Sequence, residues 1–261
     1  IILDPIFIHI FNMGISGAAV ATLISQLISF IILLSMFIFK KSIITLSPKY
    51  ISNEMWVYKD VLKVGFPSFC RQGLASIATI ILNNQAGKFG GDPALDAMSI
   101  VSKIFMIVFS VSLGIGQGYQ PVCGYNYFAK RYDRVKEAMI FTLICGLSLM
   151  LLTCVGLYIF AEPVMKAFAD EGGEAVKIGT RVIRYQSIAM PFLSLNVIAN
   201  MSFQSTKKKF SATILSCCRQ GIFFIPFILI LPEIFDLSGI EMTQALSDFC
   251  TFLFTIPFYI I

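Results

Sequence analysis

The chain has 261 residues, of which 57% are hydrophobic and 13% are charged, with a formal net charge of +5. A soluble domain has about 25% charged residues, so this composition excludes a water-soluble globular domain. Apolar residues also come in runs of about 20, the length of a helix that crosses roughly 30 Å of hydrocarbon. The sequence therefore predicts an all-α integral membrane protein, a polytopic helical bundle.

Seven membrane-spanning helices are expected in chain order, and residues 1–11 look like the tail of an eighth. The apolar runs are 14–39, 61–87, 97–122, 138–160, 181–203, 210–231 and 239–261. The first residues lack the basic region and cleavage site of a signal peptide, so none is expected. Because both ends lie within apolar runs, we expect a fragment of a longer protein, with its last helix truncated.

The connectors between these spans alternate in charge. Five, four and three Lys and Arg residues follow the first, third and fifth spans, whereas the other connectors carry mainly Asp and Glu. Basic loops stay in the cytoplasm, so odd-numbered spans should run inward and the C-terminus should be cytoplasmic. The basic clusters have no stacking aromatic residues around a groove, so no nucleic-acid partner is expected.

A short internal repeat relates two segments at a fixed offset of 222 residues. Gly17 aligns with Gly239, and Ser25 aligns with Ser247. Both copies run in the same direction, so the repeat predicts two parallel halves related by an axis along the membrane normal. Six spans in each half give a parent protein of roughly 440 residues. A chance match is the alternative.

Polar side chains recur at helical spacing inside two of the spans. They are Ser68, Gln72, Ser76, Thr79 and Asn83 in the second span, and Asn196, Asn200 and Gln204 in the fifth. Steps of three and four residues place each group on one helical face. Such a face either lines a cavity or forms hydrogen bonds between packed helices, and both interpretations stay open.

Three charged residues lie well inside their spans: Arg71, Arg219 and Asp248. A charge at mid-bilayer costs at least ~2.5 kcal/mol unless it is paired or hydrated. Asp248 is therefore a natural partner for one of the two arginines, and a purely structural ion pair is the alternative to a transport role. Lys103 and Arg184 lie nearer to span ends, where long side chains can reach the interface.

Prolines and amides mark positions where spans bend or end. Proline removes a backbone hydrogen bond and kinks a helix, and the third span ends in a Gly-, Gln- and Pro-rich segment before a basic loop. The candidates for structural or gating roles are Pro67, Gln117, Gln120, Pro121, Asn126 and Pro191. The seven cysteines form no metal-ligand pattern, so no metal site is expected.

Four segments carry a resemblance to a known family. They are LDPIFIHIFNMGISGAAVATLISQ, GFPSFCRQGLASI, NNQAGKFGGDPALDAMSI and GQGYQPVCGYNYFAKRYDRVKEA. These segments resemble the junction of helices five and six, the start of helix seven, the connector after it, and the loop after helix eight of multidrug and toxic compound extrusion (MATE) transporters. The chain most resembles the bacterial branch with Arg–Gln in helix seven, and the similarity covers essentially all of it.

The resemblance implies a twelve-helix fold with two six-helix lobes around a central cavity. Residues 1–40 would then end the N-terminal lobe, residues 41–60 would form a cytoplasmic linker, and residues 61–261 would form the C-terminal lobe. It also implies efflux of amphipathic, often cationic compounds through a bacterial cytoplasmic membrane by alternating access, driven by inward H⁺ or Na⁺ and without a cofactor. The residues expected to line the cavity are Arg71, Gln72, Ser76, Asn83, Asn196, Asn200, Gln204, Arg219 and Asp248.

Two departures from the family pattern bear on function. Phe128 stands where the family commonly has Gly, and little effect is expected. Residues 61–87 contain no Asp or Glu, so a cation site in helix seven is not expected, and the coupling acid is expected in the first helix, outside this sequence.

A flippase for lipid-linked oligosaccharides is the alternative function. It would need a larger and more basic cavity, and Arg71, Lys103 and Arg219 leave that interpretation open. The sequence holds no HExxH, nucleophile-elbow or phosphate-loop motif and no paired intramembrane acids, so no catalytic residue and no enzymatic activity are expected.

Overall fold

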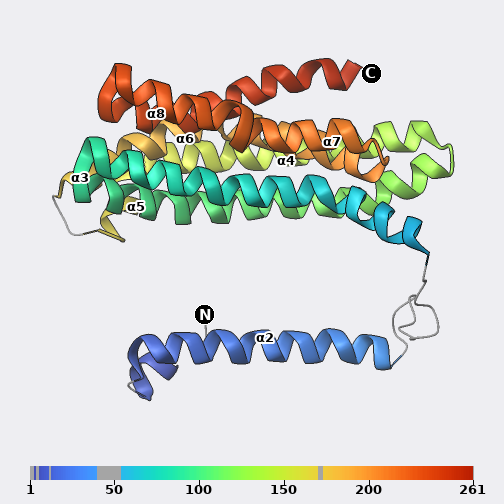
Figure 1. Ribbon diagram of the computed structural model, residues 1–261, viewed down its shortest axis with the longest axis horizontal. Coiled ribbons are helices and arrows are strands. Elements are labelled where there is room, and N and C mark those ends of the chain that lie inside the picture. Colours follow the sequence, from blue (N-terminus) through green and yellow to red (C-terminus); the bar gives the residue numbers. More distant parts are fainter. Residues whose placement is uncertain (1–2, 4–5, 12, 40–53, 170–172, 261) are drawn as a thin grey trace. The chain divides into compact units, whose positions relative to one another are not determined.

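The structure is a computed structural model that describes residues 3, 6–11, 13–39, 54–169 and 173–260. Every regular element within these ranges is a helix, which confirms the predicted all-α membrane fold. The chain divides into two compact units, Ile1–Val57 and Tyr58–Ile261. We call the second unit the bundle (Figure 1). The predicted linker 41–60 lies mostly outside the described residues, and the predicted lobe boundaries stay predictions.

The first unit holds a short π-helical turn, η1 (Ile6–Ile10), and one long helix, α2 (Gly14–Ile38). The 25 residues of α2, at 1.5 Å each, span about 38 Å, which is enough to cross a bilayer. Gly14 has a φ of +55°, a conformation that favours glycine. A Cβ atom on Gly17 would lie 2.7 Å from the Phe7 carbonyl oxygen, so η1 packs directly against the first turn of α2.

Two elements of the bundle each contain a reversal of the chain. α3 (Met55–Phe128) has 74 residues, which as one straight helix would measure about 110 Å, several times the membrane thickness. Its backbone leaves helical geometry at Gly91 (φ 62°, ψ −159°), and the two halves run back alongside each other (Figure 1). α8 (Phe224–Ile260) reverses in the same way at Asp236 (φ 48°, ψ −135°).

The other elements of the bundle connect these two hairpins. They are α4 (Tyr132–Ile159), α5 (Ala161–Lys166), α6 (Glu174–Ser205), α7 (Lys209–Cys217) and the π-helical turn η3 (Cys218–Phe223). η3 joins α7 to α8 just before Pro226. Proline lacks an N–H and crowds the carbonyl four residues earlier, which accounts for a widened turn at this point.

The number of membrane crossings agrees with the sequence. Five helices of the described residues are long and apolar enough to span a membrane. Two of them, Met55–Phe128 and Phe210–Pro257, contain the reversals at Gly91 and Asp236. Each of these two therefore supplies two crossings, which gives the seven that hydropathy predicts.

Figure 1 shows at which end of the bundle each connector lies. The reversals at Gly91 and Asp236 lie at one end, together with α5. The connectors 129–131 and 206–208 lie at the other end with the C-terminus. The basic connectors of the bundle thus share one end, as their alternation predicts. The side of the membrane that they face stays a prediction.

The predicted repeat has a counterpart in the backbone. Gly14 and Asp236 are 222 residues apart, and both have positive φ. Three residues later in each copy, a glycine packs against a preceding backbone carbonyl, which is Phe7 for Gly17 and Leu231 for Gly239. The same turn geometry at the same offset supports a true repeat over a chance match.

α6 is the central helix of the bundle. It contacts α4, α5, α7 and α8, and its buried residues include Ser187, Ser194, Asn196 and Asn200. Gly146 of α4 approaches Ser194 so closely that a Cβ atom there would overlap the serine hydroxyl. Small residues at such contacts let helices in a membrane approach each other. α6 is therefore held closely against the neighbouring helices of the bundle.

Candidate functional site

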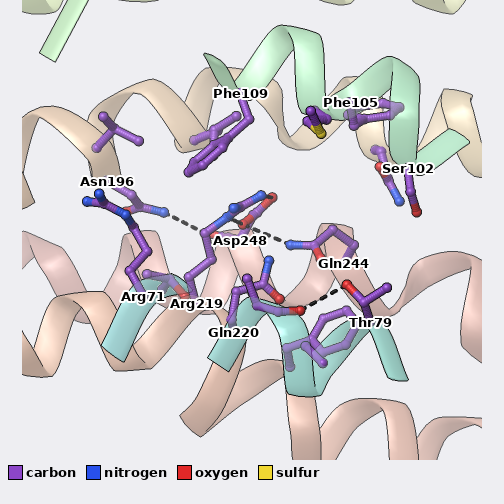
Figure 2. A pocket seen from close by; sticks show the side chains of 18 of the residues that line it. Arg71, Thr79, Ser102, Phe105, Phe109, Asn196, Arg219, Gln220, Gln244 and Asp248 are labelled. Carbon is purple, nitrogen blue, oxygen red and sulfur yellow. Dashed lines mark hydrogen bonds and ion pairs between the residues drawn. The ribbon is translucent and has the colours of Figure 1, made fainter. Parts of the chain in front are cut away.

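A cavity of about 570 Å³ lies within the bundle, bordered by α3, α6, α7, η3 and α8 (Figure 2). Much of its lining is apolar and includes Leu82, Met98, Phe105, Phe109 and Met190. A smaller number of polar and charged side chains converge on the same space. Small-molecule sites have this size and composition, with apolar contacts for affinity and a few polar groups for orientation.

The sequence assigned nine residues to a cavity, and the structure places them in two groups. On the lining lie Arg71, Gln72, Asn196, Asn200, Arg219 and Asp248. Outside the lining, among the described residues, lie Ser76, Asn83 and Gln204. The roles of all nine in transport stay predictions.

The position of Ser76 and Asn83 follows from the rotation of the first half of α3. The side of this helix that faces the cavity is centred on Arg71, Ala75 and Leu82, which recur at steps of four and seven residues. This face lies beside the polar stripe and includes only part of it. Ser76 donates its hydroxyl hydrogen to the carbonyl of its own helix at residue 72, at 3.2 Å.

An ion pair joins η3 to the second half of α8. Arg219 Nε donates to Asp248 Oδ1 at 2.5 Å, and Nη2 donates to Oδ2 at 3.4 Å. Gln244 Nε2 also donates to Oδ1, at 3.3 Å, and the Arg219 guanidinium lies 4.8 Å from the centre of the Phe109 ring. The sequence predicts that Asp248 pairs with Arg71 or Arg219. In the structure the partner is Arg219 (Figure 2).

The buried amides of α6 hold helices together while they border the cavity. Asn196 Nδ2 donates to the Asp248 carbonyl at 3.1 Å, and Thr255 Oγ1 donates to Asn196 Oδ1 at 3.2 Å. Asn200 Nδ2 donates to the carbonyl of Ala212 at 2.8 Å and to Ser216 Oγ at 2.9 Å. Both interpretations of this polar face therefore apply, since the same side chains line the space and bridge the helices.

Gln204 continues this network away from the cavity. Its Nε2 donates to Asn200 Oδ1 at 2.6 Å, and its Oε1 accepts from Gln120 Nε2 at 3.3 Å. Gln204 therefore ties the second half of α3 to α6 instead of facing the space. This contact is the physical reason for its position outside the lining.

Two further cations border the cavity without a carboxylate of their own. Arg71, in the first half of α3, and Lys103, in its second half, both line the space. Within the described ranges no carboxylate lies at ion-pair distance from either side chain. Of the charged side chains that the structure places on the lining, three are thus basic and one is acidic.

Several lining residues escape prediction from the sequence. They are Ser102, Ser110, Gln186, Gln220, Gln244 and Thr251. Most of them are isolated polar positions in apolar helices, without the periodic pattern that marks residues 68–83. Gln244 is the exception, because it lies one helical turn before Asp248 and could have been found as its neighbour.

The predicted gating residues occupy mixed surroundings. Pro67 and Asn126 are buried, whereas Gln117 and Pro121 are exposed. Asn126 Nδ2 donates to the Val122 carbonyl at 2.9 Å, which fixes the end of α3 just before the basic connector. α6 runs through Pro191 without a break. Gating roles for these positions stay predictions.

The described residues also contain an ion pair at the opposite end of α6. Arg181 Nε donates to both carboxylate oxygens of Glu241 at 3.0 Å, and Nη2 donates to Oε1 at 2.6 Å. Glu241 is 1% exposed. The pair ties the start of α6 to the second half of α8, outside the cavity lining.

Comparison with curated proteins finds multidrug export proteins among the relatives of this chain. The chain is 23% identical to the multidrug export protein MepA of Staphylococcus saprophyticus over 248 residues, which cover 95% of this chain and 54% of that protein. It is 22% identical to MepA of Staphylococcus haemolyticus, with 97% and 55% covered. The chain thus spans about half the length of the curated relatives that it matches. These relatives are transporters, not enzymes, as the sequence predicts.

Solved structures share the fold. A multidrug resistance MATE family transporter of the MOP superfamily, in an outward-facing conformation, matches with a TM-score of 0.86 at 21% identity, over 97% of this chain and 57% of that chain. A MATE transporter of Vibrio cholerae matches with a TM-score of 0.83 at 20% identity, over 97% and 57%. The model of the MatE family matches residues 67–230, more than half of this chain. The chain therefore belongs to the MatE family and is part of a multi-pass membrane transporter fold.

Proposed function

We propose that this chain forms one lobe, and the adjoining end of the other, of an exporter of amphipathic small molecules. The cavity carries the proposal, because it combines an apolar lining with converging polar side chains inside a bundle of the MatE family. Its volume of about 570 Å³ suits a drug-sized molecule. A lipid-linked oligosaccharide would need a larger space than this bundle alone encloses, and the three basic residues on the lining keep a flippase as the alternative.

The proposed mechanism is alternating access. Two lobes around a common cavity rock between inward-open and outward-open states, and binding of H⁺ or Na⁺ biases that equilibrium. α6 supplies a stable wall, because Asn196 and Asn200 fix it to α8 and α7 through buried hydrogen bonds. The lobe boundaries 1–40, 41–60 and 61–261 belong to the same proposal.

The coupling acid is proposed to lie outside the described cavity. Asp248 is the one acid among the described residues that line it, and Arg219 and Gln244 already occupy that carboxylate. A carboxylate already paired with an arginine binds a further cation less readily. The first helix of the N-terminal lobe, where the family resemblance places such an acid, is the proposed source.

The charged connectors support the proposed orientation. The basic connectors 129–131 and 206–208 lie at the same end of the bundle as the C-terminus. Under the positive-inside rule this end faces the cytoplasm, here that of a bacterium, as in the staphylococcal relatives. The partners of the chain would then be the lipid bilayer, the N-terminal lobe and the exported compounds.

Gradient-driven export tests the proposal. The full-length gene product is reconstituted into vesicles, and transport of a fluorescent amphipathic compound is followed while a pH gradient and a Na⁺ gradient are imposed separately. We expect one gradient to drive movement and an ionophore that collapses it to stop that movement. Dye transport at the same rate with and without either gradient would reject the antiport mechanism.

A further inference from the structure

The charges that face the cavity are unbalanced among the residues that the structure describes. Arg71, Lys103 and Arg219 are basic, and Asp248 is acidic. These residues come from both halves of α3, from η3 and from the second half of α8. The excess of positive charge is therefore spread around the cavity. Positive groups on low-dielectric walls concentrate their field in the space between them.

Arg219 contributes little to that field because Asp248 neutralises it. Two nitrogen–oxygen contacts join the pair, and only 19% of the arginine side chain is exposed. The Phe109 ring covers its guanidinium, and Ser247 Oγ donates to its backbone carbonyl at 2.5 Å. The pair is a fixed, nearly neutral part of the wall.

Arg71 is different, because it lines the cavity with no carboxylate at ion-pair distance among the described residues. It is half-buried, so its guanidinium is only partly hydrated. Figure 2 shows its side chain extending toward the region of Asn196 and Arg219. A planar guanidinium matches a carboxylate or phosphate through two parallel hydrogen bonds.

We infer that Arg71 binds an anionic group of the exported molecule, a carboxylate or a phosphate, while Phe105, Phe109 and Met190 hold its apolar part. Lys103 adds a second positive charge to the same space. The substrate class is thus amphipathic molecules with an acidic group, zwitterions included. This inference rests on the proposed export function and narrows its substrates. The cationic substrates implied by the family resemblance would meet repulsion from this lobe unless they also carry an acid.

A matched pair of dyes tests the assignment. A rhodamine with a free carboxylate and its methyl ester share the same cationic ring system and differ only in the anionic group. Binding of each to the purified full-length protein is measured by fluorescence anisotropy, without any gradient. We expect the wild-type protein to prefer the carboxylate dye and Arg71→Gln to weaken that binding about tenfold, the effect of losing a charged hydrogen bond. Binding of the ester should change less than about twofold.

Two further variants separate a charge contact from a structural role. Arg71→Lys keeps the charge but loses the two parallel hydrogen bonds, so its affinity for the carboxylate dye should lie between those of Arg71→Gln and the wild type. Arg184→Gln removes a cation of α6 that lies over the Tyr158 ring and not on the cavity lining, so it should leave both affinities unchanged. Thermal unfolding of every variant confirms that it is folded.

The outcomes decide the inference independently of export. Equal affinity of Arg71→Gln and wild-type protein for the carboxylate dye overturns it, and so does the absence of saturable binding to the wild type. Arg71-dependent binding without gradient-driven export supports this site and rejects the export function. Gradient-driven export of both dyes, with binding that ignores Arg71, supports the export function and rejects this site.

Discussion

Removing one partner of the Arg219–Asp248 pair should destabilise the bundle strongly, because both side chains are largely withdrawn from water. Asp248→Asn keeps the shape of the side chain but removes the charge that compensates Arg219. Exposure of only 19% and 7% for the two side chains leaves the unpaired arginine poorly hydrated. Removing one partner of a buried ion pair costs about 3–5 kcal/mol. Since Arg219 borders a cavity, we expect the lower end of that range, about 3 kcal/mol of unfolding free energy.

A double-mutant cycle isolates the interaction. Arg219→Gln, Asp248→Asn and the double variant are compared with the wild type by reversible unfolding in mixed micelles with increasing SDS. The double variant leaves no buried charge at this pair, so we expect it to be more stable than the sum of the single effects predicts, by at least about 1 kcal/mol.

An exposed ion pair of similar geometry provides the control. Lys88 Nζ and Glu233 Oε1 lie 2.9 Å apart, but both side chains are 61% exposed. Glu233→Gln should cost less than about 1 kcal/mol, because water hydrates the cation left behind. If the effects of Arg219→Gln and Asp248→Asn add within about 0.5 kcal/mol, or if Glu233→Gln costs as much as Asp248→Asn, burial does not set the strength of the pair and the reasoning fails.

Three further predictions concern the stability of the bundle, each measured by the same unfolding assay. Gly239→Ala should cost about 3 kcal/mol of unfolding free energy, because its Cβ atom would overlap the backbone carbonyl of Leu231. The control, Gly156→Ala, should be neutral or slightly stabilising, because no atom lies within 4 Å of its Cβ position. Equal effects of the two substitutions would contradict the close packing of the α8 hairpin. Asp236→Gly should stabilise by up to about 1 kcal/mol, since glycine relieves a backbone conformation that costs other residues energy, and a loss of stability would show that the Asp236 side chain is needed. Glu241→Gln should destabilise by about 2 kcal/mol, because it removes the charge from a buried carboxylate bound to Arg181; a cost no larger than that of Glu233→Gln would count against this.

The crossings could be predicted because hydrocarbon dictates both the length and the composition of a span. Hydropathy separates 210–231 from 239–261, and the structure reverses the chain at Asp236, between them. Positive φ at Asp236 could not be predicted from that residue alone. The repeat indicates it, because the position equivalent to Asp236 in the other copy is Gly14, and glycine favours positive φ.

The cavity was only partly predictable, because periodicity identifies a helix face but not the neighbour that covers it. The polar stripe of the first half of α3 pointed to Gln72 correctly, yet the rotation of that helix leaves Ser76 and Asn83 beside the lining. The depth of charged residues singled out Asp248, but only tertiary packing chooses between Arg71 and Arg219 as its partner.

Glu241 shows a different limit. It falls at the start of a predicted span, where an acid at the water interface would need no partner. The fold instead buries it against α6, and Arg181 supplies the compensating charge. No local pattern links positions 60 residues apart, so this contact follows from the arrangement of helices alone.

The reversals at Gly91 and Asp236 also bear on how the protein is made. Each joins two spans with almost no intervening loop. One span of a pair therefore cannot insert into the bilayer without the other. We expect each pair to leave the translocon as a helical hairpin. In the proposed orientation the small charged tips of both hairpins then pass through the membrane, and Lys88 of one tip lies beside Glu233 of the other hairpin. The tips of the two hairpins are thus joined to each other by opposite charges.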